Sequence, residues 1–217
     1  MNTHTSPSFV AARMALTDEF AGVFSRQTVE QCFDDSRERL PAATIERFLP
    51  LLAQRFARER LRAAARALPE FEAAARLRPL VLFVCTANSG RSQMAAALLS
   101  QRSAGSVDVV SAGTHPGDQV QAEVRTVMNE LDIDVADAFP KPLTDEVVSG
   151  ADVVITMGCG DSCPILPGRR YLDWEVADPA EVGVDVVRQI RDDIDAHVTA
   201  LLVDLDMVPA TNASGAL

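Results

Sequence analysis

The pattern of hydrophobic and polar positions changes near residue 79. Before that point, residues 16–76 are rich in Ala, Arg, Glu and Leu and hold few β-branched residues, which favours helices. Along 43–68, apolar side chains recur at the spacing of one helix face, at Ile45, Phe48, Leu49, Leu52 and Phe56. We predict three or four amphipathic helices that form a small all-α bundle over residues 1–76, with residues 1–15 flexible.

A basic stripe accompanies the apolar one on the same predicted helix. Its members are Arg55, Arg58, Arg62 and Arg66. Such a stripe can bind nucleic acid, but glutamates stand close to it in the sequence. We therefore favour a solvated or salt-bridged helix face.

Beyond residue 79, short apolar runs alternate with segments of helical spacing. The predicted strands are 79–85, 107–113, 152–158 and 170–176, and the predicted helices are 89–104, 118–133, 143–151 and 181–205. Strands that alternate with helices predict an α/β domain over residues 79–205, with a four-stranded parallel sheet and helices on both faces. We expect residues 206–217 to be a disordered tail.

Charge and composition narrow the possible partners. The 217 residues carry a formal net charge of −11, which argues against nucleic acid or an anionic membrane surface. The charge is uneven, because residues 1–78 are slightly basic and the remainder is strongly acidic. No window of about eighteen apolar residues predicts a membrane span, and the first residues lack the pattern of a signal peptide. We expect a cytoplasmic protein.

The stretch VCTANSGRSQMA, residues 84–95, combines a cysteine with an arginine six positions later. Cys85 ends the first predicted strand, and a helix is expected to begin near Arg91. Backbone N–H groups at such a corner can bind an anion, and small residues let the loop wrap around it. The predicted oxyanion-binding residues are Thr86, Ala87, Asn88, Ser89, Gly90 and Arg91.

The same arrangement favours a thiolate nucleophile at Cys85. Arg91 can bind two oxygens of a tetrahedral oxyanion, Ser92 can donate a hydrogen bond to the thiolate, and Asn88 can hold the loop in shape. Without its context, the spacing C-x5-R fits equally a buried cysteine beside a surface arginine. The preceding strand, the small residues and the following helix favour the anion site.

These residues resemble the active-site loop of the low-molecular-weight protein tyrosine phosphatase-like family. VLFVCTANSGRSQMA, together with VSAGTHPG at 110–117, is most similar to arsenate reductases of that fold that are coupled to thioredoxin or mycothiol. The resemblance covers roughly residues 79–205 and implies the four-stranded fold predicted above. The N-terminal helices resemble a unit that precedes some actinobacterial members.

Two further cysteines, Cys159 and Cys163, follow the third predicted strand. The resemblance implies that Cys85 attacks arsenate and that Cys159 then attacks Cys85, which releases arsenite. Cys163 would next form a disulfide with Cys159, and an external thiol would reduce it. A zinc half-site, completed by Cys32, His115 or His197, is disfavoured because the spacing is not that of zinc ligands. We predict no bound metal or cofactor, and we expect Cys32 to be a core residue without chemistry.

Asp178 and Pro179 match the family's general acid. From the sequence alone, a helix cap with proline in the first turn is the stronger interpretation, and the resemblance favours catalysis. Ala180 stands where phosphatases of this fold usually carry an aromatic residue, and Tyr171 is the only tyrosine. The sequence therefore offers few aromatic side chains that could pack against a phosphotyrosine ring.

The resulting hypothesis is an arsenate reductase whose disulfide is recycled by thioredoxin or by mycothiol with mycoredoxin. The proposed catalytic residues are Cys85, Arg91, Ser92, Asp178, Cys159 and Cys163. A low-molecular-weight tyrosine phosphatase and a non-enzymatic arsenic or redox sensor are the alternatives. The N-terminal helices could pair two copies into a homodimer, dock the reductant or cover the α/β domain.

Overall fold

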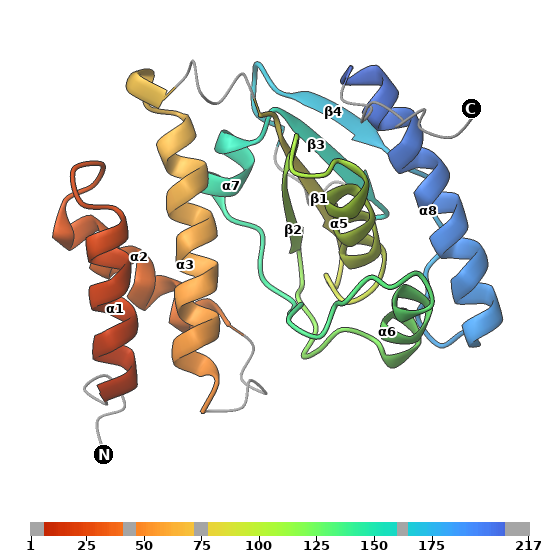
Figure 1. The fold of residues 1–217 in the computed structure, drawn as a ribbon, viewed down its shortest axis with the longest axis horizontal. Coiled ribbons are helices and arrows are strands. Elements are labelled where there is room, and N and C mark those ends of the chain that lie inside the picture. Colours follow the sequence, from red (N-terminus) through yellow and green to blue (C-terminus); the bar gives the residue numbers. More distant parts are fainter. Residues whose placement is uncertain (1–6, 41–46, 72–77, 160–164, 207–217) are drawn as a thin grey trace, which may run out of the picture.

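The N-terminal part of the chain is helical. The computed structural model describes residues 7–40, 47–71, 78–159 and 165–206. Three helices come first, α1 (Pro7–Glu19), α2 (Arg26–Arg39) and α3 (Leu49–Arg66), followed by the 3-10 turn Pro69–Phe71 (Figure 1). Pro50 lies in the first turn of α3, where its missing N–H costs nothing, so it starts that helix.

The predicted flexible segment 1–15 needs correction. Residues 7–15 belong to α1, because Phe9, Ala12 and Leu16 are buried one helical turn apart against the other two helices. Of the predicted tail 206–217, residues 207–217 lie outside the described part of the chain.

The predicted apolar stripe on α3 is confirmed in part, because Phe56, Leu49 and Leu52 pack with the N-terminal core. The buried apolar residues of the helix are Ala53, Phe56, Ala57, Leu61 and Ala63. Phe48 is 43% exposed, and Leu49 and Leu52 are only half-buried; Ile45 lies outside the described residues. Small alanines let α3 pack closely against its neighbours, so its buried face extends beyond its large apolar side chains.

The second part of the chain is an α/β layer with the predicted parallel sheet. Its strands are β1 (Leu80–Cys85), β2 (Asp108–Gly113), β3 (Val153–Met157) and β4 (Arg170–Asp173), in the order β2-β1-β3-β4. All three strand pairs are parallel. The helices are α5 (Arg91–Arg102), α6 (Ala122–Asn129), α7 (Asp145–Gly150) and α8 (Val184–Asp204).

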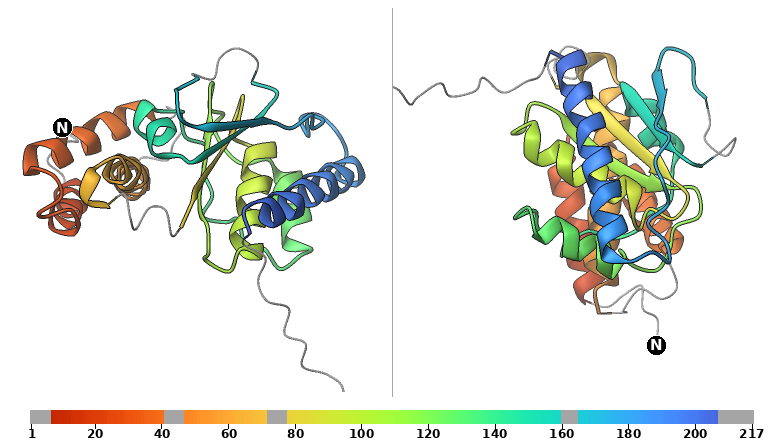
Figure 2. Two further views of the ribbon diagram at one scale, coloured as in Figure 1. Left: turned by 90° about the horizontal axis from the view of Figure 1, so that it is seen from above. Right: turned by 90° about the vertical axis from the view of Figure 1, so that its right-hand side faces the viewer.

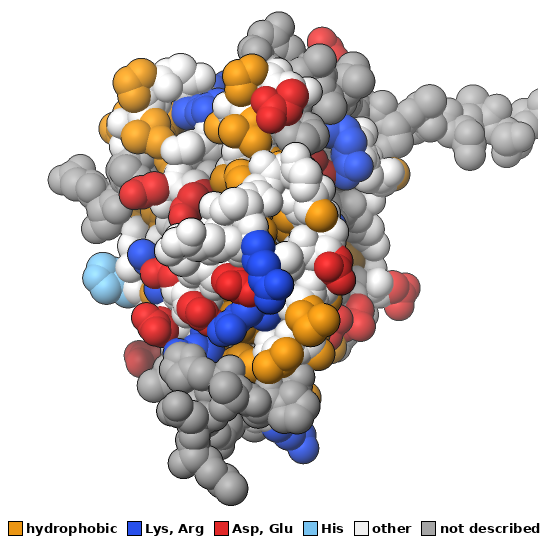
Figure 3. All heavy atoms as spheres, turned by 90° about the vertical axis from the view of Figure 1, so that its left-hand side faces the viewer, with side chains coloured by type: hydrophobic (Ala, Val, Ile, Leu, Met, Phe, Trp, Pro, Cys, Tyr) orange, Lys and Arg blue, Asp and Glu red, His pale blue; other side chains and the backbone are white. Residues whose placement is uncertain are grey.

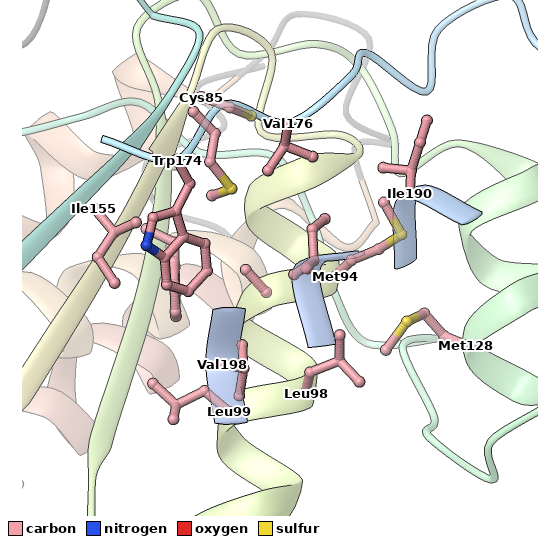
Figure 4. Close-up of a cluster of buried hydrophobic side chains, with 14 of the residues drawn as sticks. Cys85, Met94, Leu98, Leu99, Met128, Ile155, Trp174, Val176, Ile190 and Val198 are labelled. Carbon is pink, nitrogen blue, oxygen red and sulfur yellow. The ribbon is translucent and has the colours of Figure 1, made fainter. Parts of the chain in front are cut away.

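Helices cover both faces of the sheet. On one face, α5, α6 and α8 enclose a core that includes Phe83, Met94 and Trp174 (Figure 4). On the other face, α7 lies between the sheet and α3, as Figures 1 and 2 show. Among the described residues, no helix is long and apolar enough to cross a membrane.

The helix α3 belongs to both parts of the molecule. Ala63 packs in the same core cluster as Leu82 and Val148, on the second face of the sheet. A Cβ atom on Gly150 would lie 2.4 Å from the carbonyl oxygen of Ala63, so α7 and α3 are in backbone contact. The N-terminal helices therefore complete the second layer of the α/β part.

The basic side chains of α3 are mostly paired with carboxylates, as predicted. Arg58 and Arg62 both bind Glu19 of α1. Arg66 reaches across to Asp152, with an N–O distance of 2.6 Å. The outer surface of the N-terminal helices carries hydrophobic side chains interspersed with charged ones (Figure 3).

Candidate active site

Cys85 occupies the carboxyl end of the central strand β1. It lies in register with Gly113 of β2 and Met157 of β3. The chain moves from β1 to one side for β2 and to the other side for β3, so the ends of β1 and β3 form the switch point at which such sheets bind ligands.

The loop after Cys85 turns its carbonyl groups outward. The carbonyl oxygens of Thr86, Ala87 and Ser89 accept hydrogen bonds from the backbone N–H groups of His115, Gly117 and Gln121, at 2.8, 2.8 and 3.0 Å. In a trans peptide the following N–H group points the opposite way. The N–H groups of Ala87, Asn88 and Gly90 therefore point into the loop, in an arrangement suited to an anion.

The thiol of Cys85 receives two polar contacts inside this loop. The backbone N–H of Asn88 donates to Cys85 Sγ at 3.2 Å, and Ser92 Oγ lies 3.0 Å from the same sulfur. Asn88 has φ of 48°, a left-handed conformation that asparagine tolerates better than most residues. These contacts stabilise a negative charge on sulfur.

Arg91, the first residue of α5, lies at the rim of the loop. Its side chain is only 10% exposed, and Nη2 donates to Asp178 Oδ2 at 2.7 Å. A Cβ atom on Gly158 would lie 2.6 Å from Arg91 Nη1, so the guanidinium packs directly on that glycine. The carboxylate and the close-packed backbone fix the guanidinium beside the Cys85 loop.

Asp178 does not cap the closing helix. The helix α8 begins at Val184 with Gly183 at its N-cap, five residues beyond Asp178. Asp178 instead lies in a turn, where Oδ1 accepts the N–H of Ala180 at 3.0 Å. Pro179 packs over Gly90, where an added Cβ would meet the proline ring at 2.5 Å. The structure thus brings Asp178 to the loop, beside Arg91.

Cys159 lies on the segment that follows β3. The preceding residue, Gly158, adopts φ of +69°, and its carbonyl oxygen accepts a hydrogen bond from Thr86 Oγ1 at 3.1 Å. The Cys159 side chain is buried in the core of the α3 and α7 face, whereas Cys85 belongs to the core of the opposite face. Cys163 lies outside the described residues.

Three residues that support the loop, Gln93, Phe139 and Lys141, were not predicted from the sequence. Gln93 is buried, and its Nε2 donates to the carbonyl oxygens of Asn88 and Phe139, both at 3.0 Å. The backbone N–H of Lys141 donates to Asn88 Oδ1 at 3.0 Å. A buried glutamine among the small and apolar residues of α5 is a signal that the sequence offers. The position of Lys141 depends on the tertiary fold alone.

Cys32 and His197 are separate from this site, and His115 contacts the loop through its backbone N–H. Cys32 packs against the N-terminal core, and burial raises the pKa of its thiol. His115 is exposed on its turn, and His197 stacks on Trp174 with ring centroids 4.9 Å apart. In the parts of the chain that the structure describes, no group of three or more His, Cys, Asp or Glu residues is arranged to hold a metal ion.

Two family models match the chain. Residues 80–210 match the low molecular weight phosphotyrosine protein phosphatase family, and residues 11–65 match the N-terminal domain of protein-tyrosine-phosphatase-like proteins. A putative arsenate reductase from Halobacterium salinarum is 36% identical over 124 residues, which are 55% of this chain and 87% of that protein.

Solved structures extend the similarity to the helical part. A thioredoxin-dependent arsenate reductase from Corynebacterium glutamicum superposes with a TM-score of 0.82 and 40% identity, covering 94% of this chain and 98% of that one. The YwlE arginine phosphatase from Geobacillus stearothermophilus matches with a TM-score of 0.52 and 27% identity, covering 59% of this chain and 93% of that one. The fold is therefore shared by proteins described as reductases and as phosphatases.

Proposed function

We propose that this chain, which belongs to the low molecular weight phosphotyrosine protein phosphatase family and is similar to arsenate reductases, is an arsenate reductase. The similarity to the arsenate reductase from Corynebacterium glutamicum supports this activity and extends over 94% of the chain, including the N-terminal helices. The roles of Arg91, Ser92 and Asp178 are proposed from their contacts around Cys85, and those of Cys159 and Cys163 from the family resemblance.

The first step is attack of the Cys85 thiolate on arsenate. A sulfur–arsenic bond forms and an arsenic–oxygen bond breaks. Arg91 and the inward N–H groups of the loop bind the remaining oxygens. Asp178 gives a proton to the departing oxygen, which leaves as water. Ser92 donates to the sulfur while it carries negative charge. The Asp178 oxygens have different partners, since Oδ1 accepts from Ala180 and Oδ2 from Arg91. When substrate binds, its oxygens replace Asp178 Oδ2 as the partner of Arg91.

The second step reduces arsenic. The Cys159 thiolate attacks the sulfur of Cys85, a disulfide forms, and the electron pair of the sulfur–arsenic bond stays on arsenic, which leaves as arsenite. Cys163 then exchanges with the disulfide, so that Cys159 and Cys163 are joined and Cys85 is regenerated.

One observation carries the choice of reductase over phosphatase. Gly158 contacts both Arg91 and Thr86, and Cys159 is the next residue, so its segment adjoins the loop. The Cys159 side chain must leave the second core before it meets Cys85, and the positive φ of Gly158 gives the backbone freedom to turn there.

A single turnover tests this relay. The pre-reduced protein is mixed with arsenate without any reductant, arsenite is counted, and disulfides are mapped by mass spectrometry. We expect one arsenite per chain and a bridge between Cys159 and Cys163. In Cys163→Ser we expect one arsenite and a bridge between Cys85 and Cys159, with multiple turnover lost. If Cys163→Ser turns over like the parent, the relay is wrong.

A phosphatase is the second candidate, because the loop, Arg91 and Asp178 equally suit a phosphate ester. Hydrolysis of p-nitrophenyl phosphate is therefore measured in parallel. Rapid ester turnover without arsenite release would assign the protein to the phosphatases. Binding of arsenite without either turnover would instead indicate a sensor.

The reducing partner is an external thiol, and we propose thioredoxin. A relay that ends in an internal disulfide presents thioredoxin with its usual substrate, whereas mycothiol with mycoredoxin is needed when a second protein thiol is absent. Steady-state arsenate reduction with each system in turn distinguishes them. A requirement for mycothiol would overturn the choice of thioredoxin. Such a relay also requires a reducing compartment, which fits the cytoplasmic location that we predict.

We propose that the chain divides into a helical unit (1–76), a reductase domain (79–205) and a tail (206–217). We also propose that two copies pair through the N-terminal helices. The exposed apolar side chains Val10 and Met14 of α1, with Phe48 and Leu51 near the start of α3, are available for such pairing. Sedimentation of the protein and of Met14→Glu tests it.

A further inference from the structure

Residues 139–141 contact helix α3 of the N-terminal helical unit on one side and the Cys85 loop on the other. Glu59 of α3 forms an ion pair with Lys141, whose Nζ lies 3.1 Å from Glu59 Oε1. Phe139 packs against the N-terminal hydrophobic core, and the Arg55 guanidinium lies 5.3 Å from its ring centroid. Residues 139–141 are therefore fixed from the side of the helical unit.

The backbone of this segment contacts the loop directly. The N–H of Lys141 donates to Asn88 Oδ1 at 3.0 Å, and the carbonyl oxygen of Phe139 accepts from Gln93 Nε2 at 3.0 Å. The carbonyl oxygen of Lys141 accepts the N–H of Gly113 at 2.9 Å, which ties the segment to the end of β2. The two residues held by α3 are thus the same two that support Asn88.

These bonds decide the direction of hydrogen bonding at the sulfur. A backbone N–H can only donate, so the Asn88 atom that faces Lys141 must be the amide oxygen. The Asn88 NH₂ group then faces Ser92 and donates to its Oγ at 2.8 Å. Because Ser92 Oγ accepts this bond, its own proton is directed to Cys85 Sγ, 3.0 Å away. Reversing the amide would remove that donation.

The ion pair that anchors the segment is partly buried, with side-chain exposures of 10% for Lys141 and 30% for Glu59. The second carboxylate oxygen of Glu59 is buried without a hydrogen-bond partner among the described residues. Burying charged groups with incomplete pairing offsets much of their attraction, so such a pair is weak evidence of a stabilising role. Its geometry instead fits a positioning role.

We propose that Glu59 and Lys141 are positioning residues through which the N-terminal helical unit sets the Cys85 loop in its active arrangement. The helical unit then acts on catalysis through Asn88 and Ser92, without contacting substrate. The inference rests on the proposed function only in taking Cys85 as the nucleophile.

The test measures the Cys85 thiolate separately from arsenate reduction. In the full chain, the rate of iodoacetamide alkylation of the Cys85 peptide is followed by mass spectrometry as a function of pH. We expect Glu59→Ala and Lys141→Met to move the midpoint of this profile upward by about 0.5 to 1 pH unit, since one hydrogen bond to the sulfur is weakened. The KM for arsenate should rise about three- to tenfold, with a smaller change in kcat.

Glu146→Ala is the matched control. It removes the ion pair between Arg60 of α3 and Glu146 of α7, with an N–O distance of 2.7 Å, which joins the same two parts of the molecule without touching residues 139–141. We expect its alkylation profile and KM to equal those of the parent. Exchanging the charges in Glu59→Lys with Lys141→Glu should restore the parent profile.

Equal profiles in Glu59→Ala, Lys141→Met and the parent would overturn the inference, and so would an equal shift in Glu146→Ala. A shift that tracks only loss of thermal stability across the variants also overturns it. A shifted profile in a protein that never releases arsenite keeps the inference and refutes the reductase. Normal arsenate reduction by the parent, with the same alkylation profile in the parent and the two variants, refutes the inference and keeps the reductase.

Discussion

At the scale of single residues, the site depends on donors that converge on one sulfur atom. The Asn88 N–H and the Ser92 hydroxyl approach Cys85 Sγ from two directions, and neither group is exposed to solvent. Hydrogen bonds to a charged group in a buried site are stronger than those between neutral groups. Ser92 should therefore affect the rate far more than its single hydroxyl suggests.

Replacing Ser92 tests this expectation. In Ser92→Ala we expect kcat/KM for arsenate to fall about 10- to 100-fold, as for loss of one hydrogen bond to a charged group. Single-turnover kinetics provide the measurement. Ser100→Ala, on the exposed side of the same helix, should leave the rate unchanged. A similar rate in both variants would show that the sulfur does not need the hydroxyl.

At the scale of elements, close backbone approach fixes how the helices cover the sheet. The contact between Gly150 and Ala63 places α7 directly on α3, with no side chain between them. This approach lets the N-terminal helix share the core of the second sheet face with α7. Glycine is needed there because any Cβ atom would meet a backbone carbonyl that cannot turn aside.

A methyl group at this contact should separate the two helices. For Gly150→Ala we expect the free energy of unfolding to fall by about 1 to 3 kcal/mol, the usual cost of overpacking. Chemical denaturation followed by circular dichroism measures it. Gly183→Ala is the control, because a Cβ there meets nothing within 4 Å and the change costs only the N-cap preference for glycine over alanine, which we expect to be smaller. Equal stabilities for the two variants would contradict the contact.

At the scale of the whole molecule, buried charge joins the helical unit to the α/β part. Arg60, only 4% exposed, binds Asp35 of α2 and Glu146 of α7, both through carboxylate oxygens. Burial is the largest single effect on the pKa of Glu146 and raises it, but the hydrogen bond and charge of Arg60, together with hydrogen bonds from the Glu146 backbone and Thr144, outweigh burial and hold the pKa below the usual 4.5. The junction is therefore sensitive to acid.

The sign of this dependence follows from the lowered pKa. The carboxylate stabilises the fold fully above the unfolded pKa of 4.5, and the contribution is lost as the pH falls through the lower folded value. Glu146 is partly exposed, so we expect Glu146→Gln to cost about 0.5 to 1 kcal/mol at pH 7. The difference from the parent, measured by urea denaturation, should shrink as the pH falls below 4.5. A constant difference across pH would contradict this account.

The sequence predicted the four parallel strands and most of the helices, because buried strands and amphipathic helices leave periodic patterns. Two of its predictions needed correction. The start of α1 was expected to be flexible, although residues 8–16 are mostly apolar and Phe9 and Leu16 are buried. The buried face of α3 was predicted only in part, because alanines, which carry little hydrophobic signal, form much of its contact surface.

The sequence by itself determined the strand, the small-residue loop and the helix that hold Cys85 and Arg91, since local chain geometry suffices to form an anion-binding corner. Only the tertiary structure decided the position of Asp178, which lies 87 positions from Arg91 in the chain yet hydrogen-bonds to it. It also decided that Glu59 and Lys141 lie next to the loop. Such contacts arise from packing between distant segments, which leaves no periodic trace in a single sequence.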